Sequence, residues 1–163
     1  CGERLVEIEG IKNVVVVPPE DSETGQVLTL SQPDIDALVR SKAAMYTILT
    51  TISNTVNIPM KDIDKFYIAG TFGTYIDPRS AITIGMIPDR PSETYVPLGN
   101  TSLEGASRAL LSSQDRDEIY RIRDQITYIE LNVNQEFMNL FSAAKFLPHT
   151  DRSLFPSVEV RSS

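Results

Sequence analysis

The most constraining stretch of the sequence runs from Asp64 to Pro78, where a short apolar run ends abruptly in glycines. Residues 65–69 are aromatic and branched, which is typical of a buried strand. Gly70 and Gly73 follow, and glycine permits a positive φ or a very close approach of another group. The stretch therefore predicts a strand, a glycine turn and a helix.

The predicted helix begins with Asp77 as its N-cap and Pro78 as its first residue, and Gly85 after Ile84 ends it. The glycine turn has two interpretations: a tight strand-to-helix connection or a ligand loop. No Gly-Lys-Ser/Thr follows it, and the GxGxxG spacing is absent. Taken alone, the motif favours the tight connection.

Composition limits what the chain can be. Its 163 residues suffice for one domain with a core, and 41% are apolar. The net charge of −7 disfavours nonspecific binding to nucleic acid or an anionic membrane. Uninterrupted apolar runs stay far below the roughly 20 residues of a membrane-spanning helix. We expect a cytoplasmic protein.

The chain contains one cysteine, Cys1, and one histidine, His149. These cannot form an internal disulfide, a Cys/His metal site or a cluster site of four thiolates, so we assign no metal ligand. His149 follows Pro148 in a polar stretch, and we expect it to be solvated rather than catalytic. A start at cysteine rather than methionine suggests a fragment of a longer protein.

The opening third predicts an antiparallel β unit, with a hairpin of residues 5–8 and 13–17 and a third strand at residues 26–30. Ser31 and Asp34 resemble a capping box, and an apolar stripe predicts a helix to about Val56. Lys42 lies beside this stripe. A lysine that extends to solvent is favoured there over a phosphate contact.

The second half predicts another strand at residues 94–98, which ends in Gly99 and Asn100. A helix over residues 102–111 follows, with Thr101 and Glu104 as its capping box. Two strand, glycine and helix units in succession predict a parallel pair of strands. Beyond them we expect three more elements: a helix capped by Ser113 through about Asp124, a strand over residues 126–131, and a helix starting at Asn132 or Asn134.

Several ordered stretches between about residues 28 and 147 together resemble the C-terminal part of the reductive activators of corrinoid proteins. The stretches are LSQPDID from residue 30, RSKAA from 40, YIAGTFGTYIDPRSA from 67, IGMIP from 84, LGNTSLEGA from 98, YIEL from 128, and EF at 136–137. The resemblance implies an α/β lobe of the actin, sugar kinase and heat-shock chaperone ATPase superfamily. Such a ribonuclease-H-like lobe would hold a mixed sheet, with the antiparallel β unit followed by β/α units.

In that superfamily two lobes close on ATP and magnesium, and a glycine-rich turn of the second lobe lies against the adenosine. The resemblance places this turn at Gly70 to Gly73, with Thr71 offering a hydroxyl and Phe72 or Tyr75 a flat face for adenine. Both aromatic residues could equally belong to the core. Gly99 and Asn100 should lie beside Gly70 if the strands are neighbours, although Asn100 could merely cap the next helix.

The resemblance also implies how the whole protein works. The family's activators carry an iron–sulfur domain upstream and use ATP to help reduce cobalt(II) corrinoid to cobalt(I) for methyl transfer. This chain has no cluster cysteines and no Asp-x-Gly-Thr phosphate loop, so we assign it no catalytic residue and expect it to be inactive alone. The expected partners are a corrinoid protein, the amino-terminal lobe and, in a homodimer, a second copy.

We expect residues 1–148 to form one α/β lobe and residues 149–163 a polar tail. The alternative function is a structural or docking module that binds no nucleotide and contacts partners through its acidic surface. The two hypotheses differ in what Gly73→Val should do. An ATP-binding lobe predicts that this change removes nucleotide binding and leaves the fold intact.

Overall fold

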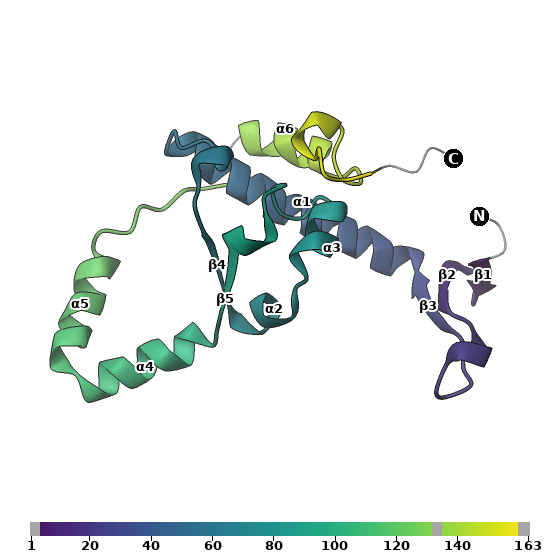
Figure 1. Ribbon diagram of the computed structural model, residues 1–163, viewed down its shortest axis with the longest axis horizontal. Helices are drawn as coiled ribbons and strands as arrows, with labels where there is room; N and C mark the ends of the chain where they lie inside the picture. The colour runs from purple at the N-terminus through teal and green to yellow at the C-terminus, as the bar shows by residue number, and fades with distance from the viewer. Residues whose placement is uncertain (1–3, 132–134, 160–163) are drawn as a thin grey trace.

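The computed structural model describes residues 4–131 and 135–159, which are arranged along one long helix, α1 (Gln32–Thr55) (Figure 1). The predicted capping box is confirmed. The Ser31 hydroxyl accepts a hydrogen bond from the Asp34 N–H, and the Asp34 carboxylate accepts one from the Ser31 N–H. These bonds satisfy two of the backbone N–H groups that a helix start leaves unpaired.

The predicted antiparallel unit is also confirmed. It consists of β1 (Leu5–Ile8), β2 (Ile11–Val17) and β3 (Leu28–Ser31), in the order β1-β2-β3. Gly10 has a φ of 77° in the tight turn between β1 and β2, a conformation that glycine adopts at little cost. β3 runs directly into α1, so this sheet projects from the amino-terminal end of the helix (Figure 1).

The second sheet pairs β4 (Phe66–Ala69) with β5 (Tyr95–Gly99) in parallel, as predicted. Two short helices connect the strands, α2 (Gly70–Tyr75) and α3 (Pro78–Thr83). The expected single mixed sheet is not formed. Within the described residues the antiparallel and parallel sheets are separate, because they lie toward opposite ends of α1 (Figure 1).

After β5 the chain forms an arm that projects from the rest of the molecule, α4 (Thr101–Leu111) and α5 (Ser113–Arg123) (Figure 1). The N-cap of α5 is Ser112 rather than the predicted Ser113, since the Ser112 hydroxyl accepts the Asp115 N–H. The predicted strand over residues 126–131 is wrong. These residues form no strand, and with Ile126 and Tyr128 exposed they have no sheet edge to pair with.

The last helix, α6 (Gln135–Ala144), packs along α1, and its predicted start at Asn132 or Asn134 lies outside the described residues. Four short 3-10 helices lie wholly within the described residues: Pro19–Asp21, Met60–Asp62, Ser92–Thr94 and Arg152–Leu154. No helix in residues 4–131 or 135–159 combines the length and apolar character needed to cross a bilayer.

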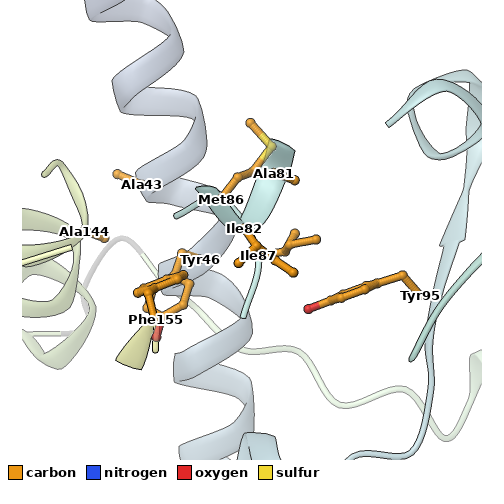
Figure 2. Close-up of a cluster of buried hydrophobic side chains, with 9 residues drawn as sticks. All are labelled: Ala43, Tyr46, Ala81, Ile82, Met86, Ile87, Tyr95, Ala144 and Phe155. Carbon is orange, nitrogen blue, oxygen red and sulfur yellow. The ribbon is translucent and has the colours of Figure 1, made fainter. Parts of the chain in front are cut away.

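The core gathers side chains from α1, α3, α6, the loop after α3, β5 and the carboxyl-terminal segment (Figure 2). Its members are Ala43, Tyr46, Ala81, Ile82, Met86, Ile87, Tyr95, Ala144 and Phe155. The segment after Pro148 therefore contributes to the core, since the Phe155 and Tyr46 ring centroids lie 5.3 Å apart.

Two predictions about polar side chains in this region are wrong. Lys42 neither extends to solvent nor is free for a phosphate. Its side chain is fully buried and donates to the carbonyl oxygens of Phe146 and Pro148, the latter at 2.7 Å. His149 is not solvated: it is only 8% exposed and packs against Tyr46 at a centroid distance of 5.4 Å. Both are buried because the carboxyl-terminal segment folds back onto α1.

Candidate functional site

The predicted site lies where β4 and β5 end side by side. The parallel register pairs Ala69 with Gly99, so Gly70 and Gly99 are neighbours at the carboxyl ends of the two strands. This confirms the prediction that Gly99 and Asn100 lie near Gly70. Ligands of α/β proteins commonly bind at such strand ends.

Gly70 and Gly99 share an unusual backbone conformation and an open surrounding. Their φ values are 84° and 67°, in the left-handed region that favours glycine. A Cβ atom built on either residue would meet no atom within 4 Å. Glycine is thus required here for backbone conformation, and apart from the adjoining residues no atom of the described chain fills the space at either Cβ position.

Gly73 has a different role. It is buried in α2, where a Cβ atom would lie 2.5 Å from the Ile68 carbonyl oxygen and 2.6 Å from the Ile68 Cγ2. The residue allows α2 to pack directly on β4. The expectation that Gly73→Val leaves the fold intact is therefore wrong, because the larger side chain would push α2 away from the strand.

The glycine turn predicted for residues 70–73 is the first turn of α2, and its other two members are exposed. The Thr71 hydroxyl makes no hydrogen bond with the part of the chain that the structure describes. Phe72 is half exposed and borders an apolar hollow of about 140 Å³ between α1 and β4. Tyr75 is 82% exposed, so it does not belong to the core.

Three polar residues near the site act as helix caps or surface groups. The Asn100 Oδ1 accepts the Leu103 N–H at 3.0 Å and caps α4, so the predicted Thr101–Glu104 capping box is replaced by this bond. Glu104 instead approaches Arg108 at 3.8 Å on the exposed surface. Asp77 caps α3 as predicted: hydrogen bonds from Ser80, and then the Arg79 charge, lower the pKa of its carboxyl.

The arrangement can hold a ligand but offers little chemistry. No acid or base lies among Gly70, Thr71, Phe72, Gly73, Gly99 and Asn100, so none of these six could activate the Thr71 hydroxyl as a nucleophile. Within the described residues no three His, Cys, Asp or Glu side chains are grouped to bind a metal ion. The open space at the two glycines lets a ligand approach the backbone closely. A single cysteine does not fit a cluster held by four thiolates.

Sequence reasoning missed a second hollow, of about 520 Å³, which Arg79 and Arg90 border together with Ser92 and Ser157. It lies before β5, at the end of the sheet opposite Gly99. No local motif marks it, because the four residues come from three separate segments of the chain.

Parallel strands ending in left-handed glycines, with helices between them, fit the actin-like class of ATPase folds. Residues 1–159 match the family model described as the C-terminal domain of RACo, the ASKHA domain, and the chain belongs to this family. A solved structure, the reductive activator for corrinoid,iron-sulfur protein, is similar with a TM-score of 0.84 and 39% identity, covering 97% of this chain and 25% of that one.

Two curated relatives share the similarity. The corrinoid activation enzyme RamQ of Eubacterium limosum is 30% identical over 77% of this chain and 21% of its own length. The [Co(II) methylated amine-specific corrinoid protein] reductase of Methanosarcina barkeri is 24% identical over 72% of this chain and 22% of its own length. The chain thus spans between a fifth and a quarter of these relatives.

Proposed function

We propose that this chain is the adenosine-binding lobe of an ATP-dependent reductive activator of corrinoid proteins. The relatives named above are corrinoid activators or reductases, and the chain belongs to their family. The observation that carries the nucleotide proposal is the meeting of Gly70 and Gly99 at the carboxyl ends of β4 and β5.

In this proposal the two glycines let the adenosine lie against the backbone, where any side chain would block it. Thr71 offers its free hydroxyl beside them, and Gly73 holds α2 in place against Ile68. Asn100 keeps the start of α4 fixed through its cap. Magnesium and the phosphates would be held mainly by another part of the protein, because the described residues offer no carboxylate cluster for them.

In this proposal ATP would supply the free energy for the whole protein and an iron–sulfur centre the electron, and this chain, with one cysteine, would hold no such centre. The substrate is a cobalt(II) corrinoid on a partner protein, which takes up one electron to become cobalt(I) for methyl transfer. This chain would contribute nucleotide binding and the contact between lobes, not the redox step. Its activity in isolation is expected to be absent.

The test is Mg-ATP binding by calorimetry to the intact protein that contains this chain, with Gly70→Val and Gly99→Val. Both should weaken binding by about tenfold or more, because the side chain enters the space proposed for adenosine. Gly25→Val is the matched control. Gly25 has a φ of 66° and the same open space around its Cβ position, but lies in the loop before β3.

Equal ATP affinity in folded Gly70→Val and Gly25→Val variants would refute the adenosine site. The docking function would then be the better explanation. One observation favours it independently: the α4–α5 arm has no buried residue and exposes Leu110 and Leu111. Exposed apolar side chains on a projecting arm are typical of a surface that contacts another protein or domain.

A further inference from the structure

We propose that the hollow between Arg79 and Arg90 binds a small anion through a phosphate or carboxylate group. It is separate from the adenosine site, because β5 lies between them: Ser92 precedes this strand and Gly99 ends it. Its volume of about 520 Å³ is within the range of small-molecule sites.

Arg90 has a buried nitrogen without a hydrogen-bond partner among the described residues. This nitrogen is the Nε, which is inaccessible to solvent. A guanidinium carries five N–H donors, and a buried donor without an acceptor is costly. Such groups are rare in folded proteins, and a bound water or ion is one explanation for them.

The two arginine charges beside the hollow also favour an anion. Neither Arg79 nor Arg90 forms an ion pair or a side-chain hydrogen bond within residues 4–131 and 135–159. One acid, Asp89, also borders the hollow, and its two carboxylate oxygens accept the Ser157 N–H and hydroxyl, both at 2.7 Å. Two arginines and one acid therefore border the hollow, so its lining is net positive in a chain whose net charge is −7.

The residues that border the hollow come from three separate segments of the chain. Arg79 lies on α3, Arg90 follows the core residue Ile87, and Ser157 comes from the carboxyl-terminal segment that Asp89 fastens in place. The hollow is thus bordered by segments that the core itself positions. The guanidinium fork matches phosphate and carboxylate oxygens, which accept two parallel N–H bonds. Ser92 adds a hydroxyl at the rim.

The experiment titrates the intact protein with pyrophosphate in one arm and malonate in the other, at constant ionic strength, by calorimetry. We expect saturable binding of at least one anion, weakened about tenfold in Arg90→Gln and less in Arg79→Gln. Arg116→Gln, an exposed arginine of α5 with no ion pair among the described residues, is the matched control and should bind like the unmodified protein. The stronger arm identifies the anion class.

Absence of saturable binding up to about 10 mM of either anion, or equal weakening in Arg90→Gln and Arg116→Gln, would overturn the proposal. If Arg90→Gln fails to fold, anion binding by Arg79→Gln tests the proposal instead. Arg79 is exposed on α3, so its replacement should not disturb the fold. Gly70→Val should leave anion binding unchanged. That result separates this site from the adenosine site, so either proposal can fail without the other.

Discussion

The centre of the molecule around α1 and the α4–α5 arm are both helical and both contain apolar residues, yet they differ completely in burial. In the centre Ala43 and Ala144 are fully buried, and Tyr46 contacts both His149 and Phe155. In the arm Leu110 and Leu111 are 81% and 89% exposed. An apolar helix face thus becomes core only where another segment covers it.

The two regions also differ in how they are stabilised. The centre depends on segments that are distant in the sequence, since Lys42 bonds a carbonyl 106 residues away. The arm depends on local bonds, such as the Ser112 cap and the pair of Glu118 with Arg121. Exposed pairs of this kind contribute little stability. The centre should therefore be sensitive to substitution and the arm tolerant.

Among polar side chains the largest effect is expected for Lys42→Met, which keeps the length of the side chain and removes the amine. The Phe146 and Pro148 carbonyl oxygens would lose their donor in a buried site, at a cost of about 2–3 kcal/mol in the free energy of unfolding. Urea unfolding measures it. Lys12→Met, on an exposed residue of β2, is the control, and an equal effect of both changes would contradict the role of Lys42.

A smaller effect is expected from pH, through His149. Burial, and then the positive charge of Lys42, lower the pKa of its imidazole below the usual 6.5. The unfolded chain then binds a proton near pH 6.5 that the folded chain does not, so the free energy of unfolding should fall as pH decreases from 7 to 5. The Asp151 N–H also donates to the His149 Nδ1 at 3.0 Å, which requires that nitrogen to be unprotonated.

The chain's single histidine makes this measurement direct. A proton NMR titration should show one imidazole with a pKa below 6.5, and His149→Gln should flatten the dependence of stability on pH between 5 and 7. An imidazole pKa at or above 6.5 would show that the carboxyl-terminal segment does not bury His149 in solution.

The smallest effect is expected for Leu110→Ser with Leu111→Ser, which should change the free energy of unfolding of this chain by no more than about 0.5 kcal/mol. Ile87→Ala in the core should cost about 2–5 kcal/mol by comparison. Urea unfolding compares the two. A large loss in the leucine variant would mean that the arm is covered in solution and that the two regions differ less than their exposure indicates.

The sequence predicted those features that depend on residues close together in the chain. Local patterns predicted the Ser31–Asp34 capping box, the Asp77 cap and the parallel pairing of β4 with β5. The burial of Lys42 was not, because nothing near it in sequence shows that residues 146–148 supply its acceptors. The strand expected over residues 126–131 is not formed for a related reason, because a strand needs the edge of a sheet to pair with and the local sequence does not show whether one is near.

Similar limits apply to the candidate site. The proximity of Gly70 to Gly99 could be predicted, since the carboxyl ends of adjacent parallel strands lie at the same edge of a sheet. The role of Gly73 could not be separated from that of Gly70 by sequence, because both are glycines in one motif. Only the position of Ile68 shows that one faces open space and the other a packed strand.

The continuity of β3 with α1 has a mechanical consequence. Ser31 is both the last residue of β3 and the N-cap of α1, so no linker residue separates the amino-terminal sheet from a helix about 36 Å long. The sheet cannot swing freely on this joint. A rotation there must first break the capping box, worth about 1 kcal/mol, so the joint favours the observed angle without being locked in it.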